Sequence, residues 1–186
     1  MLSIPFLRST IRSKAGRTEP KVVPDVSETL TLARKALRAG NASRAHSLVV
    51  PTLSEKDAPA EARLVAGKAL SAMGRYPEAL MHFEAYLASE PGSVEGLLAA
   101  GLTAARAQEM ARAADWFNRA CLALTGRARK LIEPLMKTAR HDPVAIEEMV
   151  AELESYPEDR ERALALACAL GRAGHFRAVE RYLPGI

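Results

Sequence analysis

The chain has few of the residues that build chemical centres. Its 186 residues include two cysteines, Cys121 and Cys168, and four histidines, and none of these shows the spacing of metal ligands. It lacks a glycine-rich phosphate loop, and its paired acids Glu147 and Glu148 are typical of a solvated helix face. We therefore expect no enzyme activity, no cofactor and no metal site. Both cysteines lie in Ala/Leu-rich stretches, where we expect them to be small buried hydrophobic residues.

Aromatic residues are also scarce. They make up 5% of the chain, although hydrophobic residues make up 48%, so alanine and leucine must fill the interior, which suits closely packed helices. No apolar run approaches the roughly 20 residues that a membrane span requires, and the amino terminus is a poor secretory signal. We expect a cytoplasmic protein, peripheral to a membrane complex at most, and the Ala/Arg-rich usage is typical of bacterial sequences.

The folded part of the chain has no excess of either charge. The net charge is +4, from 26 bases and 22 acids, and residues 1–21 hold five of the bases and one of the acids. Removing that segment leaves 21 residues of each sign, so the tail carries the whole excess. A nucleic-acid partner is therefore disfavoured, because no net basic face runs through the body.

The basic tail forms a segment of its own, which we place at residues 1–25, before a helical domain over residues 26–186. Pro20 and Pro24 separate the two. Three interpretations stay open for the tail: a solvated extension, a docking arm that inserts into a partner or folds back, and a transit peptide or weak membrane-surface anchor. Pro5 counts against the third, because it interrupts an amphipathic helix early. The docking candidates are Ile4, Phe6, Leu7, Arg8 and Arg12.

The most informative feature present is a recurrence every 34 residues. Gly67 and Gly101 stand 34 apart, and so do Phe83 and Phe117. A period of this length is typical of stacked two-helix units that bury their faces against one another. Without a side chain, each glycine lets its partner helix approach closely, and each phenylalanine fills the space that remains.

The pattern predicts helices in pairs. Apolar spacing and turn residues place them at about 26–39 and 42–53, then at about 60–73 and 77–89, with a third pair within 94–125. Beyond residue 125 the pattern degrades, and a final helix pair follows before residue 186. Gly174 lies 100 residues after Gly74, two short of three periods, so the register slips near residues 125–130.

The second of these units, residues 60–93, resembles a tetratricopeptide (TPR) repeat. The matching residues, in order and spacing, are Gly67, Leu70, Gly74, Tyr76, Ala79, Phe83 and Pro91. The other two units keep fewer of the signature positions. These are Ala33, Gly40 and Ala45 in the first unit and Gly101, Ala113, Phe117 and Ala120 in the third. The third unit has Gln108 and Met110 where the turn glycine and tyrosine belong, and Tyr86 of the second stands where the family has a small residue.

The resemblance implies an all-α fold, a TPR-like α-solenoid of antiparallel helix pairs. It would contain about three clear repeats, one degenerate repeat and a C-terminal helix pair. In the family, the first helix of each pair lines a concave groove, and residues four and seven apart share one helix face. The groove candidates are Leu30, Arg34, Leu37, Arg38, Glu61, Leu64, Lys68, Ser71, Glu95, Leu98, Leu102 and Arg106.

This groove would combine leucines with a line of cations. Such a surface suits a peptide with apolar anchors and some acidic character, so we expect a non-catalytic adaptor or scaffold that holds a protein partner, a peptide or a subunit, within a larger complex. The alternative for the cations is that they are solvated and balance Glu61 and Glu95. A terminal-carboxylate clamp is disfavoured, because Leu30 and Leu64 stand where its polar groups would be expected.

Two other functions compete with the adaptor. One is a structural subunit of a membrane- or envelope-associated assembly, docked through the tail. The other is an RNA-binding helical repeat. Its candidate cations are Arg34, Arg38, Arg106, Arg127, Arg129 and Lys130.

Overall fold

The computed structural model describes residues 25–54, 58–126, 128–132 and 159–182, together with residues 144, 147–148, 151 and 155. Every regular element among them is an α-helix, which confirms the all-α prediction for this part of the chain. The helices are α1 (Val26–Arg38), α2 (Ala42–Leu53), α3 (Ala60–Ala72), α4 (Tyr76–Ser89), α5 (Val94–Arg106), α6 (Met110–Ala123), α9 (Arg160–Arg172) and α10 (Phe176–Tyr182). The expected tail, apart from Asp25, and most of the expected degenerate unit lie outside the described residues.

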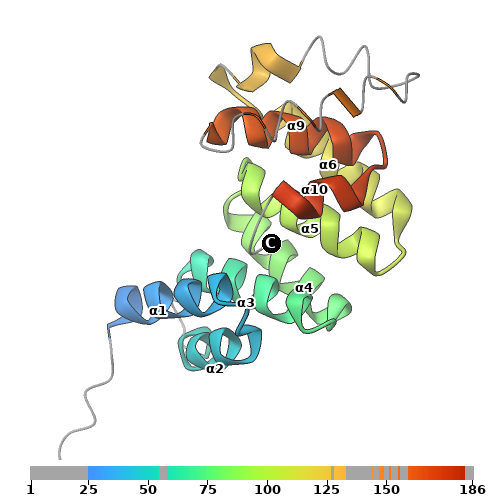
Figure 1. Cartoon of the computed structure of the whole chain (residues 1–186). Coiled ribbons are helices and arrows are strands. Elements are labelled where there is room, and N and C mark those ends of the chain that lie inside the picture. Colours follow the sequence, from blue (N-terminus) through green and yellow to red (C-terminus); the bar gives the residue numbers. More distant parts are fainter. Residues whose placement is uncertain are drawn as a thin grey trace, which may run out of the picture.

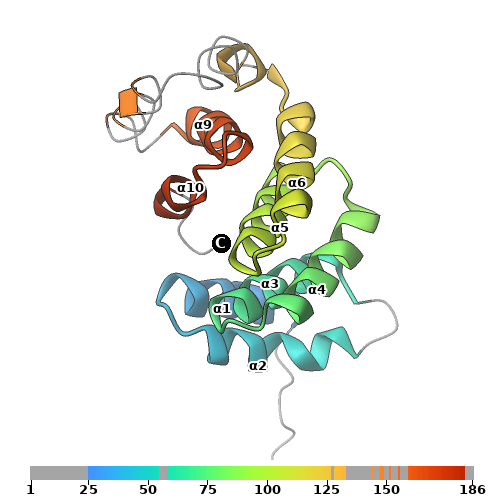
Figure 2. The same cartoon turned by 90° about the vertical axis from the view of Figure 1, so that its right-hand side faces the viewer.

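Consecutive helices pack in pairs, and each pair packs on the next. The pairs are α1–α2, α3–α4, α5–α6 and α9–α10, and α2 contacts α3, α4 contacts α5, and α6 contacts α9. Figure 1 shows the colours advancing from blue to red along this stack. The first helices of the pairs also contact one another, α1 with α3, α3 with α5, and α5 with α9. In addition α10 contacts α5, so the C-terminal pair meets α5 with both of its helices (Figure 2).

Four turns between paired helices share one geometry. Gly40, Gly74, Gln108 and Gly174 have positive φ, at 74°, 77°, 64° and 87°. In each case this residue donates its N–H to the carbonyl three residues earlier, and the next residue donates to the carbonyl five residues earlier. This is the Schellman ending of a helix, which favours glycine because a left-handed residue with a Cβ is strained. Gln108 adopts the same left-handed conformation although it is not a glycine.

Helix α3 lies at the boundary between two hydrophobic clusters. Ala62, Val65 and Ala66 belong to a cluster with residues of α1 and α2. Leu64 and Leu70 belong to a larger cluster that extends through α4, α5 and α6 to α9 and α10. Because α3 buries two faces, the core continues from one helix pair into the next and does not close within any single pair.

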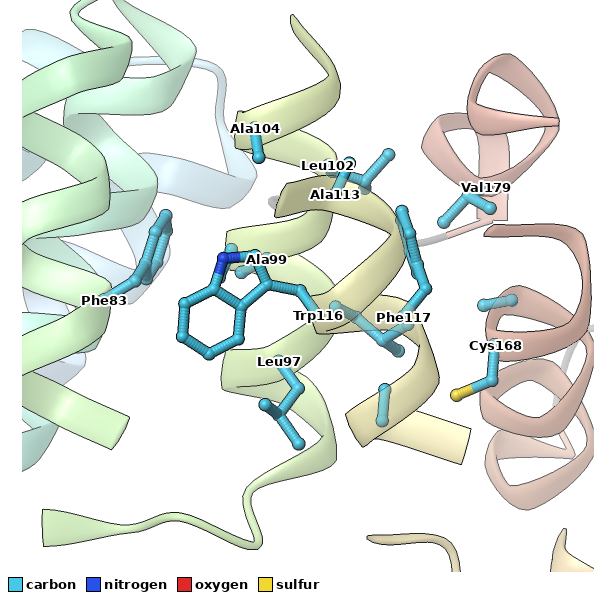
Figure 3. Packing of buried hydrophobic residues seen from close by; sticks show 14 of the residues in the cluster. Phe83, Leu97, Ala99, Leu102, Ala104, Ala113, Trp116, Phe117, Cys168 and Val179 are labelled. Carbon is cyan, nitrogen blue, oxygen red and sulfur yellow. The ribbon is translucent and has the colours of Figure 1, made fainter. Parts of the chain in front are cut away.

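The recurrent glycine and phenylalanine meet as the sequence predicts. A Cβ at Gly67 would lie 2.7 Å from the Phe83 ring, and one at Gly101 would lie 3.1 Å from the Phe117 ring. Phe117 is also pressed against α9, because a Cβ at Gly171 would lie 2.2 Å from its ring. Figure 3 shows Phe117 on the side of α6 that faces α9 and α10, whereas Trp116 points the other way, toward Phe83.

Tyr86 shows how a bulky residue fits a slot that the family fills with a small one. Its ring occupies the space left by Gly96 of α5, where a Cβ would lie 2.5 Å away. Its hydroxyl donates a hydrogen bond to Ser93 Oγ at 3.0 Å, and the same Ser93 oxygen accepts the Gly96 N–H at the start of α5. The second and third units are therefore joined here by a tyrosine matched to a glycine.

Candidate binding groove

Two neighbouring pockets lie along α1 and α3, with volumes of about 270 Å³ and 370 Å³. They share Leu37 and Lys68, so we treat them as one surface and call it the groove. The residues that line the groove are Arg34, Leu37, Arg38, Gly40, Ala42, Leu64, Val65, Lys68, Ser71, Ala72, Tyr76, Glu95, Arg106 and Arg160. The smaller pocket lies just below the usual range of ligand sites, about 300–1,000 Å³, and the larger lies at its lower end, so each has room for side chains of an extended segment.

Eight of the twelve groove candidates from the sequence line these pockets. They are Arg34, Leu37, Arg38, Leu64, Lys68, Ser71, Glu95 and Arg106. These eight residues are thus neighbours around the same two pockets.

The other four candidates do not line the groove. Leu98 and Leu102 are fully buried, at 0% exposure, and Leu30 is 7% exposed, so these three side chains belong to the core. Leu98 and Leu102 lie on α5, which α9 and α10 both contact. Glu61 is exposed and binds Arg34 instead. Leu64, although a lining residue, is only 6% exposed, so the expected apolar anchors are largely hidden and the accessible groove is mainly polar.

An ion-pair ladder connects successive first helices across the groove. Arg34 of α1 pairs with Glu61 of α3 at 2.9 Å, and Lys68 of α3 pairs with Glu95 of α5 at 2.5 Å. The partners in both pairs are 27 residues apart, which is one contact repeated by the 34-residue period. The next position in this series is Leu102, which is buried under the C-terminal pair. The two ion pairs agree with the alternative interpretation in which Arg34 and Lys68 balance Glu61 and Glu95.

At the α5 end, Arg106 bridges the groove and the C-terminal pair. Its Nε donates to Glu180 of α10 at 2.8 Å, and its Nη1 lies 3.4 Å from Ser71 Oγ. Ser71 in turn shares a buried hydrogen bond of 2.8 Å with Thr103. Arg106 therefore helps to hold α10 beside α5, and it also lines the groove.

Glu95 is an acid of the groove that interacts with three cations. Burial would raise the pKa of its carboxyl, but the charge and hydrogen bond of Lys68, aided by Arg160 and Arg34, outweigh burial and hold that pKa below its ordinary value. Arg160 of α9 reaches Glu95 at 3.2 Å. Glu95 is thus an anion held by several cations, and it lies between the ladder and the start of α9.

The groove carries more cations than anions. Five of its lining residues are basic and one, Glu95, is acidic. When Glu61 and Glu180, the partners of Arg34 and Arg106, are added, two positive charges remain in excess. Arg38 is exposed and forms no ion pair with any described residue. Facing cations without a full set of partners favour an anionic group on a ligand.

Arg160 is the charged groove residue that sequence reasoning missed; the uncharged lining residues that it missed are Gly40, Ala42, Val65, Ala72 and Tyr76. Arg160 lies 65 residues from Glu95, and it comes from the C-terminal pair, which the sequence pattern does not place in space. The only local signal is that Arg160 follows Asp159, whose side chain caps α9 through the Arg162 N–H. That cap predicts where α9 begins, but it does not indicate which neighbour the helix meets.

The remaining sequence predictions concern the tail, the basic residues near position 130, the two cysteines and a possible metal site. The tail candidates, Ile4, Phe6, Leu7, Arg8 and Arg12, and also Arg127, lie outside the described residues, whereas Arg129 and Lys130 are exposed. Cys168 is buried as expected, but Cys121 is only half-buried. Within the described ranges, no group of three or more His, Cys, Asp or Glu residues is placed to hold a metal ion.

None of the helices that the structure describes is long and apolar enough to cross a membrane. No protein-family model matches the chain, and no curated protein has a sequence that matches it.

Proposed function

We propose that this chain is a non-catalytic protein-binding module that holds an acidic, extended segment of a partner protein in the groove along α1 and α3. The observation that carries the proposal is the excess of cations among the groove residues, with Arg38 exposed and outside the ladder. A partner carboxylate could pair with Arg38 without displacing an existing ion pair. The two small pockets on either side of Lys68 would receive neighbouring side chains of the segment.

We further propose that the helices form a TPR-like solenoid. Two independent contacts support this finer description, because both recur at the 34-residue period. The Schellman turns at Gly40, Gly74 and Gln108 follow it, and so do the contacts of Phe83 with Gly67 and of Phe117 with Gly101. A solenoid presents its first helices as a continuous surface, which is the usual way in which such arrays bind extended peptides.

Peptide selection tests this function directly. We expect the full chain, used as bait for a displayed library of random peptides, to enrich sequences rich in Asp and Glu. A labelled peptide from that pool should bind the Arg38→Glu variant at least 10-fold more weakly, since one facing charge changes sign and close charge pairs couple by about 1.5 kcal/mol or more. Arg38 is the better target than Leu64, because Leu64 is buried and its replacement by Glu would unfold the chain.

The matched control is Arg44→Glu. Arg44 is an exposed arginine of α2 that does not line the groove, so the same charge change should leave peptide affinity within about twofold. Equal binding by Arg38→Glu and the parent chain, or enrichment of peptides without acidic character, would reject the groove proposal. Affinity for oligouridylate that exceeds peptide affinity and falls linearly in log salt would instead favour the RNA alternative.

A further inference from the structure

The junction between α6 and α9 is unusually close. Phe117 of α6 lies against Gly171 of α9, where no Cβ could fit, and its ring stacks on Phe176 of α10 with centroids 5.5 Å apart. One turn along each helix from this contact stand the two cysteines of the chain, Cys121 on α6 and Cys168 on α9. The glycine thus allows an approach that brings two thiols together from distant parts of the sequence.

The two cysteines lie in the same packed junction, because Cys121 packs against the hydrophobic cluster that contains Cys168. Cys168 is buried, whereas Cys121 is only half-buried. Figure 3 shows the Cys168 sulfur on the side of α9 that faces α6. Neither cysteine belongs to the groove, and the proposed binding function makes no use of them.

The environments of the two thiols differ in a way that assigns them different roles. Interaction with the neighbouring Cys168 thiol and the charge of Arg172 lower the pKa of Cys121 despite its partial burial. Interaction with Cys121, together with burial, raises the pKa of Cys168 well above its ordinary value. An accessible thiol with thiolate character reacts with oxidants, whereas a buried protonated thiol does not.

We propose that Cys121 and Cys168 are a peroxide-oxidisable pair, in which Cys121 is the attacking thiol and Cys168 the resolving thiol, and whose disulfide links α6 to α9. The inference rests on the placement of the two cysteines, each one helical turn from the close contact between Phe117 of α6 and Gly171 of α9. Its consequence for the fold is a covalent bond between the first three helix pairs and the C-terminal pair, which covers α5.

The chemistry needs hydrogen peroxide as the oxidant. The Cys121 thiolate attacks one peroxide oxygen, the O–O bond breaks, and Cys121 becomes a sulfenic acid while hydroxide leaves and is protonated to water. The Cys168 sulfur then attacks the Cys121 sulfur, the S–O bond breaks, and the departing hydroxide takes the Cys168 proton to form a second water. Two thiols are oxidised, one peroxide is reduced, and a sulfenic acid is the only intermediate.

Treatment of the reduced full chain with hydrogen peroxide tests the proposal. We expect loss of two hydrogens in the intact mass, loss of both maleimide-reactive thiols from the unfolded product, and a protease fragment in which Cys121 and Cys168 are linked. The product should contain no disulfide between two chains. Its melting temperature should rise on oxidation and fall back to the original value on reduction. Retention of both thiols, or disulfides only between chains, would overturn the proposal.

Two alanine variants separate the roles. With Cys168→Ala, oxidation should stop at a Cys121 sulfenic acid that dimedone traps. With Cys121→Ala, Cys168 should keep its thiol under the same treatment. Oxidation of Cys168 in that variant at the rate seen in the parent chain would contradict the assignment. Circular dichroism confirms folding of both variants, and the linked fragment from the parent chain is decisive even if Cys168→Ala is unstable.

Discussion

The faces of α1–α3 and of α5 are built from corresponding helix positions, yet one is open and the other is covered. On α1 and α3 the repeated position holds Arg34 and Lys68, each of which reaches an acid on the next first helix. On α5 it holds Leu102, which is fully buried, and both helices of the C-terminal pair contact α5. A change from a cation to a leucine thus coincides with the end of the groove. In a repeat array, the side chain at one recurring position indicates whether that helix face is exposed to solvent or packed against another helix pair.

The largest expected effect comes from removing the side chain that joins the two regions. Phe117 contacts Gly101 within its own unit and Gly171 of the C-terminal pair, so Phe117→Ala should cost about 3–5 kcal/mol of unfolding free energy. The matched variant is Phe83→Ala, at the corresponding position one period earlier and also fully buried. Its cost should be similar in urea unfolding.

The two phenylalanine variants should differ in where protection is lost. Hydrogen exchange under native conditions should show faster exchange in α9 and α10 for Phe117→Ala, but not for Phe83→Ala, whose side chain rests on Gly67 of α3. If both variants loosen α9 and α10 equally, Phe117 is not the specific link between the regions.

A smaller effect should follow from filling the contact on the other side. Gly171→Ala would place a Cβ 2.2 Å from the Phe117 ring, and that ring cannot move easily because it is buried and stacked on Phe176. We expect a loss of about 1–3 kcal/mol, measured by urea unfolding, although alanine is intrinsically better than glycine in a helix. Gly92→Ala, at an exposed glycine with open space around it, should have almost no effect. A stabilised Gly171→Ala would mean that α9 is not held against Phe117.

The helix pairs could be predicted from the sequence because their signals are local. Gly40 and Gly74 end helices by a conformation that glycine favours, and the pattern of glycine and phenylalanine at 34-residue spacing identifies the close contacts. The same logic selected most of the groove residues on α1 and α3. Helical spacing says which side chains share a face, and that part of the prediction needs no knowledge of distant elements.

The covering of α5 could not be predicted, because it depends on where a distant helix pair packs. Leu98 and Leu102 were expected in the groove, since they share the face of Arg34 and Lys68, but α9 and α10 pack against α5. Because the register slips after residue 125, the 34-residue period does not indicate where the C-terminal helix pair packs. Arg160, which joins the groove through Glu95, was missed for the same reason.

Two repeats place different residues in the same turn conformation. Gly74 and Gln108 occupy equivalent turns with φ of 77° and 64°, but only glycine adopts this region without strain. Gln108→Gly should therefore stabilise the chain by about 1 kcal/mol, the left-handed penalty less the entropy cost of glycine. The reciprocal Gly74→Gln should destabilise it by a similar amount. Thermal unfolding of both variants measures the pair, and a destabilised Gln108→Gly would show that the glutamine side chain makes a contribution larger than the backbone strain.

The smallest expected effect concerns the last ion pair of the ladder, where the open face meets the covered one. The pKa of Glu95 is lower in the folded chain than its ordinary value of 4.5, and Lys68 is the main cause that lowers it. As pH falls, the unfolded chain therefore binds the proton first, so the stabilisation is complete above about pH 4.5 and is lost as pH falls through the folded-state value. Glu95→Gln should remove this part of the acid dependence, so its unfolding free energy should fall less steeply than that of the parent chain below that pH. Parallel slopes for the two chains, followed by chemical unfolding over this range, would show that the pair contributes nothing to stability and that the ladder matters only for the charge it presents to a ligand.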